Sequence, residues 1–144
     1  MDAKMAYRET AVQGASQVGL VVLLYEQIIE DLRVAVEALR NHQIELRTRR
    51  INHAILVLGH LQSTLNKEQG GKVAHDLDHY YNLLRAKLTE AQARASQQIL
   101  QAQIADLLSL CEAWIQVDHA ENPHNRTNPL EPSSDQASSA KWSS

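Results

Sequence analysis

The first long run of apolar residues follows the spacing of an amphipathic helix. Counting from Val21 in steps of three or four residues, every position reached up to residue 39 is apolar, which is the pattern of one helix face. Ser16 precedes the run and has the side chain of a helix N-cap, and Asn41 follows it where a helix can end. The pattern therefore predicts a first helix with the apolar face Val21, Leu24, Tyr25, Ile28, Leu32, Ala35, Val36 and Leu39.

Three further runs with helical spacing occupy residues 51–65, 73–91 and 100–115. Gly70-Gly71, the only double glycine in the chain, is expected to separate the second helix from the third. The boundary between the third and fourth runs has no helix breaker, and only Ser96 is suited to cap a new helix there, so one long helix also fits this stretch. Four runs with short links favour an all-α fold, an antiparallel up-down four-helix bundle.

The two ends of the chain have a different composition from the predicted bundle, which spans residues 16–120. Residues 1–15 carry Met5, Tyr7 and Val12 among polar residues and Gly14, and they are expected to form a short N-terminal arm. Residues 121–144 hold all three prolines, six serines and only four apolar residues, so burial cannot offset the entropy cost of ordering them. This segment is expected to be a disordered C-terminal tail, with Trp142 as its one large apolar group.

Composition narrows the class of protein. The 144 residues include no phenylalanine and are rich in Ala and Leu, which favours helix over β-sandwich or βαβ architectures. A net charge of −3 argues against a dedicated nucleic-acid binder, and a single cysteine excludes an internal disulfide framework. No apolar stretch approaches the roughly 20 residues that span a bilayer, and the start of the chain is not expected to be a signal peptide.

His75 and His79 are the strongest candidates for metal chemistry. They lie four residues apart on one face of the predicted third helix, a spacing that can bind zinc, with Asp76 where zinc proteases carry Glu. Both fall beside the apolar stripe rather than on it, so we expect solvated surface histidines. A metal-dependent bundle enzyme remains an alternative.

Other chemical signals are weaker. Glu121 and His124 have the Glu-x-x-His spacing of di-iron bundles, but Pro123 breaks the helix that would align them. Cys111 lies on the apolar stripe of the fourth helix and is expected to be a buried thiol. A basic cluster, Arg47, Arg49 and Arg50, is expected to be a solvated face. With no phosphate-binding loop or nucleophile elbow, we expect no catalytic activity, metal or cofactor.

The predicted helices carry more apolar surface than one face needs. The first helix adds Leu20, Val22, Leu23 and Ile29 to its stripe, and the second adds Leu56 and Val57. Such helices are either central in the fold or present a second face to a partner. Gly59 lies in the middle of the second helix, where it leaves room for close packing or a groove.

Several of these residues resemble the flagellin export chaperones of the FliS family. Ala6-Tyr7, the cap at Ser16 and Leu24-Tyr25-Glu26 are similar to the family's opening. The run from Leu61 to Leu77, with Asn66-Lys67-Glu68-Gln69-Gly70-Gly71 at its centre, is the more specific match. Glu26, Asn66 and Asp76 depart from the residues that are usual in the family. The resemblance covers residues 6–117.

The resemblance implies a cytoplasmic chaperone that is not an enzyme. It would bind the disordered C-terminal segment of flagellin, prevent premature polymerisation and support flagellar type III export. Contacts with export-gate components, and a monomer or weak dimer without nucleic acid or membrane insertion, are also expected. A generic helix-binding adaptor is a further alternative. The residues expected to bind the client or support its groove are Tyr7, Leu24, Tyr25, Leu77 and Tyr81.

Overall fold

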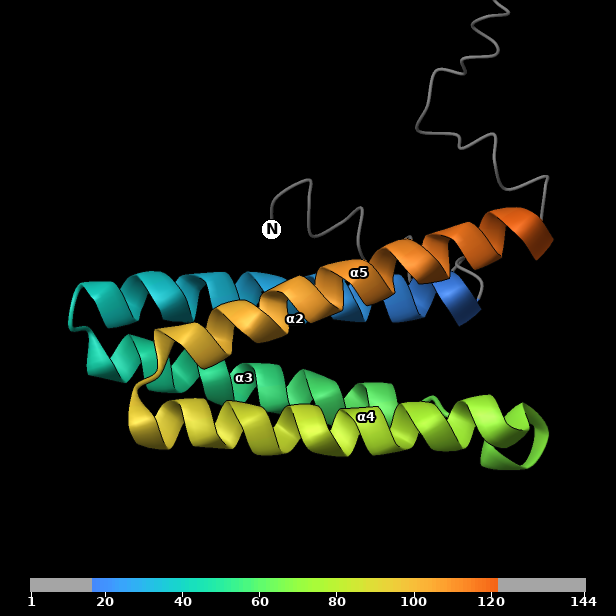
Figure 1. The fold of residues 1–144 in the computed structure, drawn as a ribbon, viewed down its shortest axis with the longest axis horizontal. Coiled ribbons are helices and arrows are strands. Elements are labelled where there is room, and N and C mark those ends of the chain that lie inside the picture. The colour runs from blue at the N-terminus through green and yellow to red at the C-terminus, as the bar shows by residue number, and fades with distance from the viewer. Residues whose placement is uncertain (1–16, 122–144) are drawn as a thin grey trace, which may run out of the picture. The chain divides into compact units, whose positions relative to one another are not determined.

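The computed structural model describes residues 17–121, all of which lie in helices or the short links between them. No strand occurs in this range, so the predicted all-α fold is confirmed as a four-helix bundle. The expectations for residues 1–15, Ser16 and residues 122–144 lie outside the described residues. The helices are α2 (Gln17–Arg40), α3 (Ile44–Ser63), α4 (Lys67–Arg94) and α5 (Gln97–Glu121) (Figure 1).

The chain divides into two compact units, the first ending at Cys111 and the second beginning at Glu112. Helix α5 starts in the first unit and ends in the second. The packing described below is that of residues 17–111.

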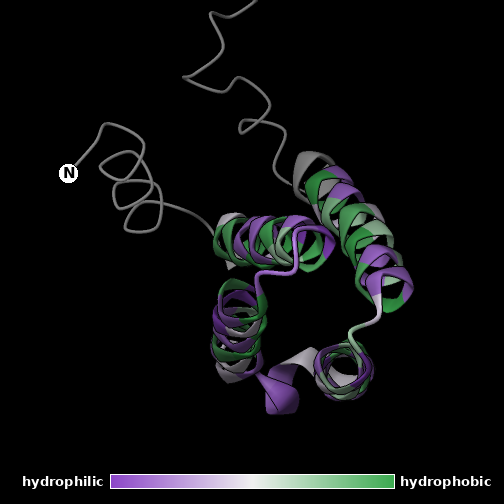
Figure 2. Ribbon diagram, turned by 90° about the vertical axis from the view of Figure 1, so that its left-hand side faces the viewer, coloured by the Kyte–Doolittle hydropathy of each residue, from purple (hydrophilic) through white to green (hydrophobic). Residues whose placement is uncertain are grey.

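Within the first unit, α3 runs antiparallel to α2 and α4 runs antiparallel to α3 (Figure 1). Viewed nearly end-on, the helices surround a common axis (Figure 2). The apolar faces predicted from the sequence meet along this axis, and burying each large aliphatic side chain contributes about 1.5–3 kcal/mol. The fully buried aliphatic residues are Ile28, Leu32, Ile51, Leu58, Leu61, Leu84, Leu88, Leu100 and Leu107.

Helix α2 ends at Arg40, immediately before Asn41, as predicted. His42 adopts a left-handed conformation with φ 58°. The amide of Gln43 donates to the carbonyl of Ala38 at 2.8 Å, and the amide of His42 donates to that of Leu39 at 3.2 Å. These two bonds satisfy carbonyls that the helix end would leave unpaired, in the arrangement called a Schellman motif.

The double glycine does not form the link between α3 and α4, but it does interrupt the helix: residues 67–70 form a first turn of α4 that non-helical Gly71 separates from the rest. The chain reverses earlier, at residues 64–66, because Asn66 caps α4: its Oδ1 accepts a hydrogen bond from the amide of Gln69 at 3.0 Å. Gly70 and Gly71 therefore lie inside α4, where Gly71 has φ 58° and ψ −134° and kinks the helix. The glycines shape the start of α4 rather than dividing it from α3.

The boundary left open between the third and fourth runs is a true break. Ala95 adopts a left-handed conformation with φ 50° and ends α4, and the amide of Ser96 donates to the carbonyl of Ala91 at 3.1 Å. Ser96 then caps α5, because its Oγ accepts from the amide of Ile99 at 3.1 Å. A left-handed alanine costs about 1–2 kcal/mol, which the bundle packing must offset.

Gly59 and Gly71 give a matched pair of stability predictions. No atom lies within 4 Å of the Cβ that alanine would add at Gly59, so this glycine permits no close helix packing. Gly59→Ala is expected to stabilise the protein by about 0.5–1 kcal/mol, because alanine is the better helix former. Gly71→Ala is expected to destabilise it by about 1–2 kcal/mol, because a Cβ disfavours its positive φ.

Urea unfolding followed by circular dichroism measures both changes. The two variants add the same methyl group to the same residue type, so each is the control for the other. Shifts of the same sign would contradict the backbone conformations described here.

None of the helices within residues 17–121 is both long and apolar enough to cross a membrane.

Candidate functional site

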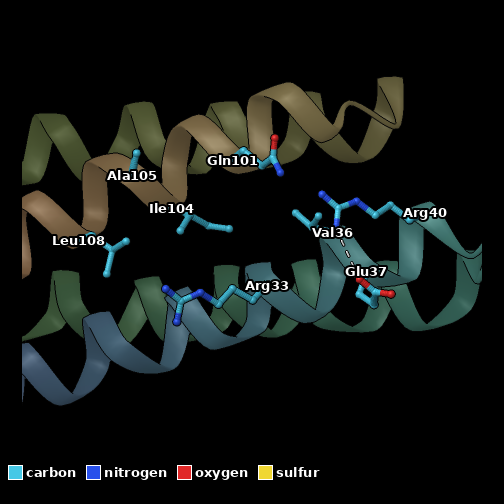
Figure 3. Close-up of a pocket in the computed structure, with 8 residues that line it drawn as sticks. All are labelled: Arg33, Val36, Glu37, Arg40, Gln101, Ile104, Ala105 and Leu108. Atoms are coloured by element: carbon cyan, nitrogen blue, oxygen red, sulfur yellow. Dashed lines mark ion pairs between the residues drawn. The ribbon is translucent and has the colours of Figure 1, made fainter.

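A groove of about 400 Å³ opens between α2 and α5. The side chains of Ile104 and Leu108 point from α5 toward α2, and those of Arg33 and Arg40 lie along the facing side of α2 (Figure 3). All of its lining residues belong to the first compact unit. They are Arg33, Val36, Glu37 and Arg40 from α2 and Gln101, Ile104, Ala105 and Leu108 from α5.

The groove results from two helix faces with the same spacing. On each helix the lining residues fall at i, i+3, i+4 and i+7, so each set forms one short stripe. Val36 is buried at the bottom, Ile104 is half-buried, and Leu108 remains 44% exposed. The apolar part of the groove, formed by Val36, Ile104 and Leu108, is therefore reachable from solvent.

Charged groups line the α2 side of the groove. Arg40 and Glu37 form an ion pair at 3.6 Å, and both side chains are half or more exposed. Arg33 is exposed and has no ion pair or hydrogen bond with any residue that the structure describes. The groove thus combines an apolar floor with one cation that is already paired and one that is free.

Tyr25 and Tyr81, two of the residues expected at the client site, form a buried pair between α2 and α4. Their hydroxyl oxygens are 2.6 Å apart, and the rings meet edge to face with centroids 6.4 Å apart. Burial raises the pKa of Tyr81 to about 12, so the phenol keeps its proton even at alkaline pH. The pair can support a binding surface from below, but neither ring is exposed on one.

The other three predicted site residues are more scattered. Leu24 and Leu77 are half-buried, and Tyr7 lies outside the described residues. None of the five lines the groove. Val36 lies on the apolar face of the first predicted helix, and Ile104 and Leu108 lie in the run at residues 100–115. Helical spacing alone does not separate residues that line a groove from those that fill the core.

Tyr80 lies next to the pair formed by Tyr25 and Tyr81. Its ring centroid lies 5.9 Å from that of Tyr81, and its buried hydroxyl has no hydrogen-bond partner among the described residues. Burial raises the pKa of Tyr80 to about 12, and the nearby Asp106 carboxylate adds to the effect. Ionisation of this phenol at neutral pH is therefore strongly disfavoured.

Asp31, which the sequence pattern did not single out, is a fully buried carboxylate between α2 and α3. Its Oδ1 accepts a hydrogen bond from Arg50 at 2.7 Å, and its Oδ2 lies 2.6 Å from Nδ1 of His53. Gln27 adds a longer bond to Oδ1 at 3.3 Å. The position i+3 from Ile28 on an apolar helix was the one available clue that this acid faces inward.

The expected basic face is divided by these contacts. Arg50 is committed to Asp31, and Nε of Arg47 donates to the side-chain oxygen of Gln92 at 3.1 Å. Arg49 is exposed. Two of the three arginines therefore join helices within the bundle instead of forming one free surface.

Among the residues considered for metal or thiol chemistry, His75, His79 and Cys111 lie where the sequence pattern placed them. His75 and His79 are exposed, and the described part of the chain contains no group of three His, Cys, Asp or Glu side chains suited to hold a metal ion. His124 lies outside the described residues. Cys111 is buried, as predicted; burial raises the pKa of its thiol, and the nearby Glu26 carboxylate raises it further.

Comparison with known proteins adds to this geometry. Residues 1–121 match the family described as flagellar protein FliS. The chain belongs to the FliS family. The match covers every helix described above and confirms the resemblance found in the sequence.

Similar proteins include flagellar secretion chaperones from three bacteria. Flagellar secretion chaperone FliSB of Pseudomonas aeruginosa is 32% identical over 111 residues, which is 77% of this chain and 88% of that protein. FliS of Campylobacter jejuni is 30% identical over 116 residues, covering 81% of this chain and 91% of that protein. FliS of Vibrio cholerae is 28% identical over 116 residues, covering 78% and 85%.

These relationships favour a chaperone of the flagellar export system over a metal-dependent enzyme. A chaperone acts through the surfaces on which it holds another chain, and the groove between α2 and α5 is a candidate for such a surface.

Proposed function

We propose that this protein is a cytoplasmic flagellar secretion chaperone that binds the C-terminal segment of flagellin. Binding keeps the segment from polymerising and available for export. The observation that carries the proposal is the open apolar groove between α2 and α5 on the bundle of a FliS-family protein.

The groove suits an amphipathic helix. Such a segment places apolar side chains at i, i+3, i+4 and i+7 into a hydrophobic groove, and the groove's own lining has that spacing on both walls. Burying Leu108 and Ile104 under a client supplies the favourable free energy. Ordering a disordered client opposes it by about 2–5 kcal/mol, which keeps affinity moderate and permits release at the export apparatus.

The residues expected from the sequence take supporting parts in this proposal. The hydrogen-bonded pair of Tyr25 and Tyr81 braces α2 against α4 beneath the surface. Leu24 and Leu77 are half-buried and add apolar area where a long client continues beyond the groove. Tyr7 lies outside the described residues, and its part in client binding stays a prediction from the sequence.

Isothermal titration calorimetry with the cognate flagellin C-terminal peptide tests the proposal. We expect saturable binding with a clearly negative heat-capacity change, because apolar surface is buried. An unrelated amphipathic peptide of equal length is the control, since a generic adaptor would bind both equally. No binding of the flagellin peptide at about 50 µM, corresponding to roughly −6 kcal/mol, would overturn the proposal.

A further inference from the structure

The two arginines beside the groove differ in what they already bind. Arg40 shares its charge with Glu37 at 3.6 Å, whereas Arg33 has no partner in the described part of the chain. Arg33 is also positioned beside the two apolar side chains of α5, Ile104 and Leu108, that a client would cover (Figure 3). A docked segment would therefore lie next to a cation that lacks a counter-charge.

The position of Arg33 restricts which groups on a docked segment can pair with its guanidinium. Arg33 and Arg40 are seven residues apart on α2, so their Cα atoms are separated by about 10.5 Å along the axis. A helix lying in the groove presents side chains beside its apolar stripe over the same two turns. A carboxylate at one of these positions reaches Arg33 while the apolar anchors fill the space between Val36 and Leu108.

Partial burial by a client strengthens an ion pair between Arg33 and a client carboxylate. A guanidinium group at an open surface gains little from an ion pair, because water screens it. A client in the groove removes water from one side of Arg33, which strengthens its attraction to a carboxylate and raises the penalty for a like charge. Arginine can also form two parallel hydrogen bonds with a carboxylate, which adds a geometric requirement.

We propose that Arg33 is a specificity determinant that selects a client helix with an acidic residue beside its apolar face. This inference rests on the proposed function, because the occupant is the flagellin C-terminal segment. Apolar anchors supply most of the affinity, and the carboxylate fixes the register and orientation of the helix in the groove.

Charge reversal tests this inference. Arg33→Glu is compared with Arg49→Glu, a matched reversal on α3 at an exposed arginine that has no partner in the described region. Binding of the flagellin C-terminal peptide is measured by calorimetry at low and high salt. We expect Arg33→Glu to weaken binding about 5- to 10-fold at low salt, with the loss shrinking as salt increases, and Arg49→Glu to change it less than about 2-fold.

A second arm identifies the partner carboxylate. A set of peptides, each with one acidic residue replaced by its amide, is titrated against wild-type protein and Arg33→Glu. One peptide is expected to lose affinity for wild-type protein and to bind Arg33→Glu at least as well as the unaltered peptide does, because the like-charge contact has been removed.

The outcomes separate the two proposals. If the peptide binds wild-type protein but the two reversals weaken it equally, or no single acidic residue couples to Arg33, the specificity role is wrong and the chaperone function stands. If wild-type protein does not bind the peptide, the proposed function fails and this inference fails with it. Circular dichroism melting curves check that each variant is folded.

Discussion

Replacing Leu108 by glutamate is expected to weaken binding of the flagellin C-terminal segment about 30-fold or more. Leu108 is 44% exposed in the groove wall, and a docked client would cover the remaining surface. The variant loses the burial of an aliphatic side chain and places a carboxylate against the client's apolar face, a combined cost of about 2–3 kcal/mol. Each 1.4 kcal/mol corresponds to roughly tenfold in affinity.

Leu56→Glu is the matched control, because Leu56 is a leucine on α3 that is 62% exposed and does not line the groove. It introduces the same charge change at a comparable surface position, and affinity should stay within about 2-fold. Both variants should retain wild-type circular dichroism spectra. Equal losses for the two variants would mean that the client does not use the groove between α2 and α5.

Replacing Arg50 by alanine is expected to lower the free energy of unfolding by about 3 kcal/mol. Asp31 is fully buried, and Arg50 provides its shortest contact with a permanent cation. Without Arg50, the carboxylate keeps only His53 and the longer bond from Gln27. Removing one member of a buried pair typically costs about 3–5 kcal/mol, and we take the low end because Arg50 is itself 34% exposed.

Urea unfolding of Arg50→Ala, Arg49→Ala and the double variant Asp31→Leu with Arg50→Met tests this account. Arg49→Ala removes an equally charged side chain from the same helix and should change stability by less than about 0.5 kcal/mol. The double variant replaces the pair with apolar groups and should recover most of the loss, because no buried charge is left unpaired. A loss in the double variant as large as in Arg50→Ala would show that packing, rather than the buried charge, explains the effect.

The helix boundaries show how well neighbouring residues predict where a helix begins or ends. The end of α2 before Asn41 was predicted correctly, and its carbonyls are satisfied by backbone amides around left-handed His42. The cap at Ser96 decides the boundary that the sequence left open, because its hydroxyl satisfies a nearby backbone amide. For Gly70-Gly71 the predicted break occurs, at Gly71, but it falls inside α4 because the cap at Asn66 starts the helix before the glycines. A glycine pair indicates that the backbone can adopt unusual φ and ψ angles, but it does not indicate where one helix ends and the next begins.

The site residues illustrate the opposite case. Tyr25 carries part of the family resemblance, yet it lies in the core, where its hydroxyl meets that of Tyr81, 56 residues further along the sequence. Arg33 belongs to none of the motifs that carry the resemblance, yet it lines the groove. In the sequence, Asp31 resembles any acidic residue of a helix. Only in the folded protein do Arg50 and His53 of α3 contact its carboxylate.

By itself, the sequence determined the all-α class and the family resemblance, because helical periodicity and short motifs are properties of neighbouring residues. It left open whether the third and fourth runs form one helix or two. Only the tertiary structure decided which apolar residues fill the core and which line a groove. Helix formation depends on interactions within a few residues of the chain. Whether an apolar stripe is buried or lines a groove depends on how α2 and α5 face each other, since the same stripe is covered or left open according to what packs beside it.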